Sequence, residues 1–443
     1  MITADSKNSE EFLASSKTKN NLVFADFHIH SKYSRACSKN LDLANLEKWA
    51  RVKGLDILGT GDFTHPIWLK ELKENLSDKD GKGIFYTKTG FKFILTGEIS
   101  LVFTQGGKGR RVHLVLLVPS FEAVDKINKY LDTKGRRDYD GRPIFGISCE
   151  EFTREMRKIS DEIEVIPGHC LTPWFGVFGS ESGFDSLKEA FGEEFENIHA
   201  IETGMSASPE MLWNLSFLNN KTIVSFSDSH SFWPWRLGRE ATIFNKADSY
   251  KEIIAEIREN KIYGTVETNP AYGKYHWDGH RLCNFSSSPT ETKKINGVCP
   301  VCKKPLVIGV ENRVEKLTDQ KPEDNKNRKP YFEILPLHEI IAMVYGTSIT
   351  SKKAWGIYNS LIEKFGNEFR VLLQVEKEEF LKNEVELKFV EQILLNREGK
   401  IKVIPGYDGE YGKAVMDEKE ISFEKDVEQP NTTNFNEVQK KLF

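Results

Sequence analysis

Residues 22–62, LVFADFHIHSKYSRACSKNLDLANLEKWARVKGLDILGTGD, decide the fold class of this 443-residue chain. The apolar run at 22–30 is typical of a strand. Residues 43–53 then carry apolar side chains at helical spacing and end at Gly54, where a helix stop is expected. A second apolar run at 56–62 completes a strand–helix–strand unit, which predicts two neighbouring parallel strands.

The alternation of strands and helices continues to about residue 265. Further strands are expected at 91–98, 112–118, 163–167, 198–202 and 222–228, and helices at 121–131, 150–158, 209–218 and 250–260. Roughly seven such units predict an α/β fold with a parallel sheet and a closed or nearly closed barrel. The expected segments are a disordered stretch at 1–20, the barrel at 21–265, a cysteine-bearing module at 270–317, a small α-rich domain at 331–415 and a disordered acidic tail at 416–443.

Composition excludes several classes of protein. The net charge of −4 argues against a protein that coats nucleic acid through bulk positive charge. No run approaches the ~18 apolar residues of a membrane span, so no membrane partner is expected. Residues 1–20 are polar and lack the apolar core of a signal peptide. Six cysteines in so long a chain form no disulfide framework, which favours a reducing compartment and a cytoplasmic location.

Histidines and acids gather where the predicted strands end. They are His28, His30, Asp62, His65, Glu98, His169, Asp228 and His230. A spacing of two residues on a strand points both side chains of a pair to the same side. Because the carboxyl ends of barrel strands meet at one face, these side chains should meet there. Neutral imidazole and carboxylate groups suit zinc, manganese or iron, so the pattern predicts a multinuclear metal site; each residue alone is as readily explained as a cap or turn former.

His113 fits this pattern only under a condition. It lies near the start of the predicted strand 112–118, so it reaches the same face only if that strand runs antiparallel. The alternative is a histidine satisfied within the core.

A second metal site is predicted from the cysteines. His280 and Cys283, then Cys299 and Cys302, form two pairs at knuckle spacing, which indicates a structural zinc site. His280 is the preferred fourth ligand and His276 the alternative; free thiols in a turn are the other interpretation. Lys303, Lys304, Arg313 and Lys316 would then be able to contact the backbone of a nucleic acid, or would form an ordinary solvated face.

Aromatic residues flank two of the candidate ligands. Trp174 and Phe175 follow His169, and Trp233, Trp235 and Arg236 follow His230. Tryptophans beside a metal site can stack on an extruded base. Ordinary packing of loops explains them equally well.

The motifs HIHS (28–31), GDFTHP (61–66), GEIS (97–100), PGHC (167–170) and SDSHS (227–231) resemble those of the PHP superfamily. Within it, the chain is most similar to the endonuclease Q family over roughly residues 21–415. The resemblance implies a distorted (β/α)7 barrel, a zinc-binding insert, a small C-terminal DNA-binding domain, and two or three divalent active-site ions: zinc, or alternatively manganese or magnesium.

The resemblance also implies a ligand assignment. His28, His30, Glu98 and Asp228 would hold one ion, and Glu98, His113 and His169 a second, with Glu98 bridging. His65 and His230 would serve a third. Many PHP proteins carry an acid eight residues after the first histidine, where this chain has Ala36. Asp62 could substitute, or the third site could fill only when DNA brings a phosphate oxygen.

The implied function is hydrolysis of DNA 5′ of deoxyuridine, deoxyinosine and abasic sites, with Asp228, Glu98 and His230 in the catalytic centre. One alternative is a PHP phosphatase acting on a small phosphomonoester; another is a DNA-binding scaffold with a decayed site. The C-terminal residues 439–443 resemble a sliding-clamp peptide only in part, because the usual spacing to a paired aromatic is missing.

Overall fold

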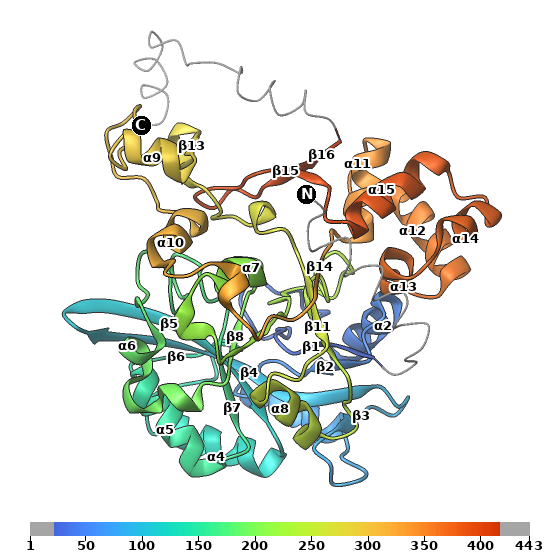
Figure 1. The fold of residues 1–443 in the computed structure, drawn as a ribbon. Coiled ribbons are helices and arrows are strands. Elements are labelled where there is room, and N and C mark those ends of the chain that lie inside the picture. The colour runs from blue at the N-terminus through green and yellow to red at the C-terminus, as the bar shows by residue number, and fades with distance from the viewer. Residues whose placement is uncertain (1–21, 417–443) are drawn as a thin grey trace, which may run out of the picture.

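The computed structural model describes residues 22–416 (Figure 1). The expectations for residues 1–20, for the acidic tail beyond residue 416 and for the clamp-like residues 439–443 therefore lie outside the described residues. A curled mixed sheet forms the lower part of the molecule in Figure 1, and the cysteine-bearing segment and a helical C-terminal region lie above it.

The described residues form one large sheet of ten strands. Its strands are β1 (Val23–Asp26), β2 (Ile57–Gly59), β3 (Phe85–Tyr86), β4 (Lys92–Gln105), β5 (Lys108–Val118), β6 (Ile144–Phe145), β7 (Glu164–Pro167), β10 (Ala241–Phe244), β11 (Gly264–Glu267) and β14 (Tyr331–Glu333). Eight of them follow the order β14-β11-β10-β1-β2-β4-β5-β7, while β3 and β6 pair with β4. The fold is thus mixed α/β with a sheet that curls into a half-barrel.

A separate parallel pair extends the curl. It consists of β8 (Ala200–Glu202) and β9 (Thr222–Val224), and β8 lies next to β7. A single parallel bridge joins Ile29, just after β1, to Ser229, just after β9. The ends of β1 and β9 therefore lie side by side.

The expected parallel sheet is only partly correct. β1–β2 and β2–β4 are parallel, as the first strand–helix–strand unit predicts. The pairs β4–β5, β5–β7, β1–β10 and β10–β11 are antiparallel. For β4 and β5 the reason is their connection: two residues cannot form the crossover that parallel neighbours need.

The β4–β5 hairpin is longer than the two strands expected at 91–98 and 112–118. Its register pairs Gln105 with Lys108 around Gly106 and Gly107, whose φ angles are 62° and 74°. A two-residue hairpin turn of this kind needs positive φ at both positions, which glycine adopts without strain. His113 therefore stands on an antiparallel strand, the condition under which it faces the same side as Glu98.

Helices cover the outer surface of the sheet. They are α2 (Leu43–Lys53), α3 (Pro66–Asn75), α4 (Phe121–Asp132), α5 (Cys149–Ile159), α6 (Leu187–Phe191), α7 (Pro209–Trp213) and α8 (Tyr250–Arg258). In α2, the Asp42 side chain caps the amide of Asn45, and Gly54 ends the helix at φ 97°. The helix expected at 209–218 ends at Trp213, and a short 3₁₀ turn, Ser216–Leu218, follows.

The chain after residue 265 forms two further regions. The cysteine-bearing segment contains β12 (Asp278–His280), β13 (Phe285–Ser287), α9 (Pro289–Lys294) and α10 (Val310–Leu317). The helical C-terminal region contains α11 (Leu337–Tyr345), α12 (Lys352–Phe365), α13 (Glu368–Leu373), α14 (Lys377–Lys382) and α15 (Leu387–Arg397), followed by the hairpin of β15 (Lys402–Ile404) and β16 (Lys413–Val415). β14 pairs with β11 before the chain enters these helices.

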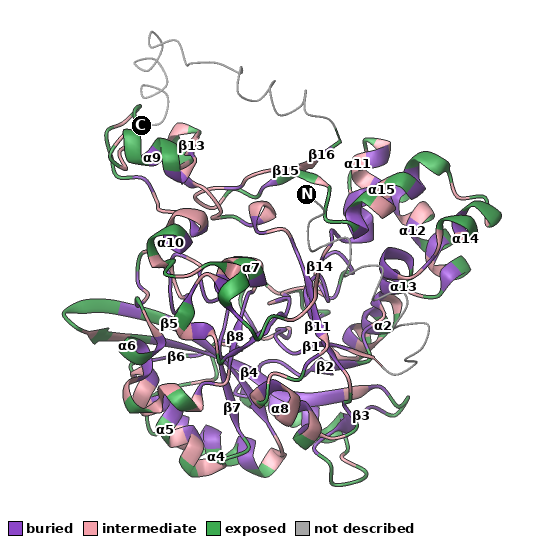
Figure 2. Cartoon of the chain, in the orientation of Figure 1, coloured by how far each residue is buried: buried purple, intermediate pink, exposed green. Residues whose placement is uncertain are grey.

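The helical C-terminal region shares a core with the sheet. Buried residues run from the sheet through α2 into α11–α13 (Figure 2). The rings of Phe24 in β1 and Phe369 in α13 are 4.9 Å apart, and a side chain at Gly54 would collide with Asn367. The two regions are therefore packed against each other without a gap for extra side chains.

Within residues 22–416, the helices include none whose length and apolar character would allow it to span a membrane.

A buried pair of carboxyl groups lies between β9, β10 and β11. Glu240 accepts hydrogen bonds from the amide of Met205 at 2.8 Å and from the Ser225 hydroxyl at 3.1 Å. The same hydroxyl lies 3.1 Å from Glu267. Burial raises the pKa of Glu240 to about 8, and burial together with the Glu240 charge raises the pKa of Glu267. The pair therefore holds a proton near neutral pH.

We expect this pair to make stability fall with rising pH. A carboxyl group whose folded pKa is raised stabilises the fold fully below its unfolded value near 4.5 and loses that contribution as the pH passes about 8. The melting temperature should drop between about pH 4.5 and about pH 8, and Glu240→Gln should reduce the drop. Glu74→Gln, at an exposed position of α3, serves as the control. An unchanged pH dependence in Glu240→Gln would contradict the assignment.

Candidate metal centre

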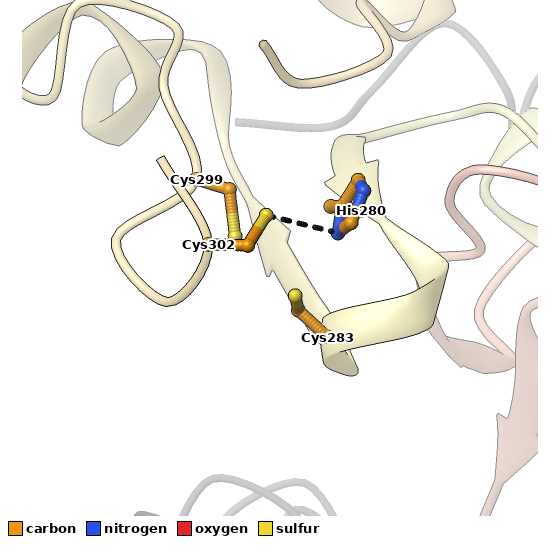
Figure 3. A group of neighbouring side chains, drawn as sticks. All are labelled: His280, Cys283, Cys299 and Cys302. Atoms are coloured by element: carbon orange, nitrogen blue, oxygen red, sulfur yellow. Dashed lines mark hydrogen bonds between the residues drawn. The ribbon is translucent and has the colours of Figure 1, made fainter. Parts of the chain in front are cut away.

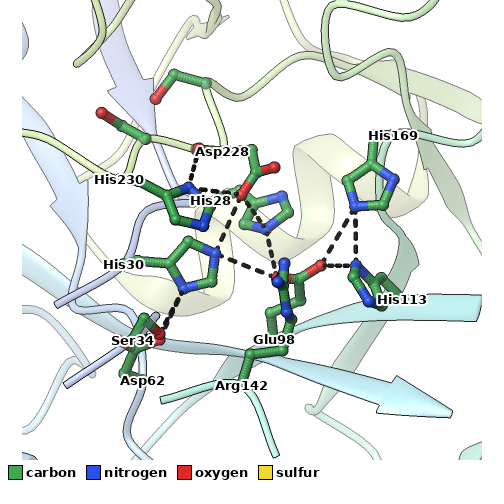
Figure 4. A network of polar contacts seen from close by, with 12 residues as sticks. His28, His30, Ser34, Asp62, Glu98, His113, Arg142, His169, Asp228 and His230 are labelled. Carbon is green, nitrogen blue, oxygen red and sulfur yellow. Dashed lines mark hydrogen bonds and ion pairs between the residues drawn. The ribbon is translucent and has the colours of Figure 1, made fainter. Parts of the chain in front are cut away.

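The strand-end residues converge on one face of the curled sheet (Figure 4). His28 and His30 follow β1, Asp62 follows β2, His169 follows β7, and Asp228 and His230 follow β9, while Glu98 and His113 face each other from β4 and β5. The residues come from six strands. They can meet because the ends of β1, β2, β7 and β9 lie on one face of the sheet and the β4–β5 hairpin adds Glu98 and His113 to the same face.

Four of these side chains form what we call the first ligand group: His28, His30, Glu98 and Asp228. The Nε2 atoms of His28 and His30 lie 3.3 and 3.2 Å from Glu98 Oε2. They lie 3.5 and 3.0 Å from Asp228 Oδ1. Four potential ligand atoms thus surround one point.

A second ligand group consists of Glu98, His113 and His169. Glu98 Oε1 lies 2.7 Å from His113 Nδ1 and 3.3 Å from His169 Nε2, and these two nitrogens are 3.0 Å apart. The two oxygens of Glu98 therefore face different groups, as a carboxylate bridging two ions does.

The spacing of these atoms fits metal coordination. With ligand bonds of about 2.1 Å, the edges of a tetrahedron measure about 3.4 Å, and most of the separations above lie close to that value. Burial lowers the pKa of His113 to about 3, so its imidazole is neutral, which is the form that binds a metal. Both groups could hold a metal ion.

Two carboxylates orient the histidines from behind. The Nδ1 of His28 is 2.8 Å from Glu202 Oε1, and the Nδ1 of His30 is 2.9 Å from Asp62 Oδ1. Each contact directs Nε2 of the ring into the first ligand group and fixes its tautomer. Asp62, expected among the ligands, lies behind His30 instead, since its other oxygen accepts from Ser31 and Ser34. Glu202 was not among the sequence candidates, although it ends a predicted strand just as Glu98 and Asp228 do.

Three site residues have left-handed backbone conformations. Asp62, His169 and Asp228 have φ angles of 49°, 30° and 47°. Such conformations are costly for residues other than glycine and cluster where a functional site requires a particular side-chain direction.

His65 and His230 do not form a third group in the described residues. The ring of His65 stacks on Tyr33 with centroids 4.3 Å apart, and the residue precedes α3. His230 lies at the edge of the first ligand group, where its ring centroid is 4.3 Å from that of His30. Its side chain is 31% exposed, so it is accessible to a molecule that binds at the first ligand group.

Arg142 adds a positive charge that the sequence analysis missed. Its Nη1 lies 3.0 Å from Glu98 Oε2. The residue comes from the loop before β6, where neither spacing nor periodicity distinguishes it. It offsets part of the charge of the buried Glu98, and together with His113 it lowers the pKa of that carboxyl group against the effect of burial.

The cysteine group consists of His280, Cys283, Cys299 and Cys302, whose ligand atoms all lie within 4.8 Å of one another (Figure 3). His280 Nδ1 is 3.7 Å from Cys302 Sγ. Lys303 closes the second knuckle at φ 62°, a position that glycine often takes. His276 lies elsewhere, with its Nε2 3.6 Å from Glu311, so the structure brings His280 and not His276 to the cysteines.

A pocket of about 200 Å³ adjoins the first ligand group. Asp228 lines it together with Thr172, Gly204, Met205, Ser206, Pro270, Gly273, Lys274, Tyr275, His276, Val310 and Tyr411. Its aromatic residues come from the cysteine-bearing segment and the β15–β16 hairpin. Sequence patterns give no signal for Tyr275 and Tyr411, because both lie more than forty residues beyond SDSHS (227–231), the last of the strand-end motifs.

The aromatic residues expected to contact DNA have varied surroundings. Trp174 packs against Tyr275, and Phe175 against His113. Trp233 is 37% exposed, whereas Trp235 is 7% exposed and packs against the helical C-terminal region. Trp235 therefore packs within the structure, as the second interpretation of these aromatic residues has it, and the stacking of any of them on a base stays a prediction.

The basic candidates divide in a similar way. Lys303 and Lys304 are exposed at the knuckle, and Arg236 lies over the Tyr411 ring. Arg313 is buried and donates to the carbonyl groups of Phe178 and Phe184, so it holds α10 to the loop between β7 and α6 and is not free for a DNA backbone.

Comparisons with known proteins place the chain in a family. A family model described as the MJ0043 C-terminal domain matches residues 336–400. The Methanocaldococcus jannaschii protein MJ0043 is 33% identical over 288 residues, and the Bacillus subtilis protein YqxK is 26% identical over 413 residues. The matches cover 63% and 88% of this chain. The chain spans about a third (34%) of the length of MJ0043 and 98% of YqxK.

Two crystal structures resemble nearly the whole chain. The lesion-specific endonuclease PfuEndoQ from Pyrococcus furiosus has a TM-score of 0.79 and 31% identity, covering 94% of this chain and 98% of its own. Endonuclease Q in complex with a duplex carrying an abasic lesion has a TM-score of 0.80 and 33% identity, covering 90% of this chain and 97% of its own. The fold and the ligand groups thus define a nuclease. The chain belongs to the endonuclease Q family.

We expect Glu202→Gln to weaken metal binding at the first ligand group. The two oxygens of Glu202 lie 2.8 and 3.0 Å from His28 Nδ1, and one of them also accepts from the His169 amide at 2.7 Å. The substitution turns one of these acceptors into an NH2 donor and removes the negative charge that orients the His28 ring. The apparent affinity for Mn²⁺, measured from the free Mn²⁺ signal in electron paramagnetic resonance, should fall roughly 10- to 100-fold. Glu164→Gln is the matched control, because Glu164 is also buried and contacts a histidine, His199, away from the site. Equal losses in both variants would show a general effect on the fold.

Proposed function

We propose that this chain hydrolyses DNA at the phosphodiester bond 5′ of deaminated bases, deoxyuridine and deoxyinosine, and of abasic sites. The observation that carries the proposal is Glu98, whose two oxygens face two separate ligand groups. The family membership supports it, since one relative is a lesion-specific endonuclease and another was crystallised on a duplex with an abasic lesion at its active site.

The residues present fit divalent cations in both groups. Neutral imidazole and carboxylate donors suit zinc, with manganese or magnesium as alternatives. Such ions would acidify a water molecule and offset negative charge on the phosphate. His28, His30 and Asp228 would hold one ion, and His113 and His169 the other, with Glu98 between them. Asp62 and Glu202 keep the rings of His30 and His28 in place.

Other residues would receive the substrate. Arg142 lies 3.0 Å from Glu98 and 26% of its side chain is exposed, so it is placed to pair with a phosphate oxygen. His230 is partly exposed beside Asp228 and is suited to transfer a proton at the scissile phosphate. The pocket lined by Tyr275 and Tyr411 has room for a base turned out of the duplex, and Lys274 and Arg236 flank it.

The same proposal covers the finer features of the fold. Residues 21–265 form a distorted (β/α)7 PHP barrel, 270–317 a zinc-binding module, and 331–415 a small C-terminal domain. The cysteine group would hold a structural zinc, because four protein ligands leave no open position. Lys303 and Lys304 would contact the DNA backbone. A cytoplasmic location is part of the proposal.

Cleavage of end-labelled duplexes tests this function. Each duplex carries one deoxyuridine, deoxyinosine or abasic site, with undamaged DNA and a phosphomonoester as controls. We expect a single metal-dependent cut 5′ of the lesion. Asp228→Asn, which keeps the shape of the side chain but removes its charge, should lower the rate at least roughly 100-fold. Asp125→Asn, on the exposed face of α4, should cleave like the wild type. Release of phosphate from the monoester without lesion-directed cutting would favour the phosphatase alternative.

A further inference from the structure

The loop that carries Asp228 and His230 is tied at its base. We call residues 227–238 the Asp228 loop. Asp26, buried at the end of β1, accepts from the amide of Ser227 at 3.0 Å and from the amide of Gly238 at 2.9 Å. One carboxylate thus joins the two ends of the loop. This contact determines where the loop leaves the sheet but leaves its outer part, residues 231–236, to other partners.

The outer part of the Asp228 loop packs on the helical C-terminal region. Trp355 of α12 lies 5.5 Å from Trp233 and 5.6 Å from Trp235, centroid to centroid. Trp235 also lies 4.9 Å from His338 of α11. Trp49 of α2 completes the cluster, at 5.4 Å from both Trp233 and Trp355. Aromatic pairs at such distances contribute more than their buried area alone.

A buried ion pair connects the loop backbone to the same region. Lys53, the last residue of α2, lies 2.6 Å from Glu368 of α13 and donates to the carbonyl group of Pro234 at 2.8 Å. Both charged side chains are almost fully buried, at 1% and 0% exposure. Glu368 also accepts from the Tyr358 hydroxyl at 2.8 Å and from the Leu337 amide at 3.0 Å. The ammonium group of Lys53 is therefore held by Glu368 of the helical C-terminal region, and it in turn holds the Pro234 carbonyl group of the Asp228 loop.

Such an ion pair contributes little to stability, because the cost of removing both charges from water offsets their attraction. The ion pair instead fixes the position of the Lys53 ammonium group and, through it, the position of the Pro234 carbonyl group. Pro234 lies four residues beyond His230 and six beyond Asp228.

We propose that Lys53, Glu368 and Trp355 are positioning residues that hold Asp228 and His230 in their active arrangement, so that the helical C-terminal region completes the metal centre from behind. The inference rests on the proposed function, in which Asp228 holds an ion. It gives this region a role besides the DNA binding expected from the sequence. A positioning role predicts changes in metal affinity and kcat, whereas a DNA-binding role predicts changes in KM and in DNA affinity.

The test uses the full chain with Glu368→Gln, with Trp355→Leu as a second variant in case the first fails to fold. Phe380→Leu is the matched control, because Phe380 is fully buried in α14 and packs on Phe365, away from the loop. Three quantities are measured: Mn²⁺ affinity, steady-state cleavage of lesion DNA, and DNA affinity at constant salt.

We expect Glu368→Gln and Trp355→Leu to lower Mn²⁺ affinity and kcat by about tenfold, with KM and DNA affinity changed by less than about twofold. Phe380→Leu should change none of the three. Weaker DNA binding with unchanged Mn²⁺ affinity and kcat would overturn the proposal in favour of a DNA-contact role. Equal losses in Phe380→Leu would overturn it in favour of general destabilisation.

The Mn²⁺ measurement separates this inference from the proposed function. If the wild type binds Mn²⁺ but cuts no lesion DNA, the proposed substrate is wrong, and the Mn²⁺ affinities of the variants still decide whether the C-terminal region positions Asp228. If those affinities equal that of the wild type, the positioning proposal fails whatever the substrate.

Discussion

The buried carboxylate of Glu98 constrains the whole centre. A lone carboxylate at this depth would be strongly destabilising unless it were paired. Its pairing comes from His28 and His30 on one side, from His113 and His169 on the other, and from Arg142. These partners reach Glu98 from four segments, which follow β1, lie on β5, follow β7 and precede β6, so the curl of the sheet and the β4–β5 hairpin are both required to assemble it.

A layer of carboxylates behind the ligands orients the metal centre. Asp62 and Glu202 hold the inner histidines, and Asp26 ties the ends of the Asp228 loop. Asp62, His169 and Asp228 have left-handed backbone conformations. These conformations are costly, so the surrounding hydrogen bonds must stabilise them. The helical C-terminal region adds the last constraint through Lys53 and the tryptophan cluster. Function at the centre thus depends on residues distributed over nearly the entire described chain.

Sequence patterns were informative where periodicity and chemistry coincide. The spacing in HIHS and SDSHS, and acids at strand ends, point to residues that the structure brings together, and the knuckle spacing does the same for the cysteine group. The antiparallel direction of β5 was left open, as the condition on His113, although Gly106 and Gly107 are the local signal for a hairpin. The burial of Trp235 could not be predicted, because the residue that covers it, Trp355, lies 120 positions further along the chain and no local pattern links the two.

Anomalous X-ray scattering from crystals grown with Mn²⁺ tests the central claim most directly. The account predicts two peaks on either side of Glu98, about 3.5 to 4 Å apart, one beside His28, His30 and Asp228 and the other beside His113 and His169. A further metal should lie among Cys283, Cys299 and Cys302. A map with no peak within bonding distance of Glu98, in crystals whose cysteine group is occupied, would contradict the claim that this carboxylate bridges two ions.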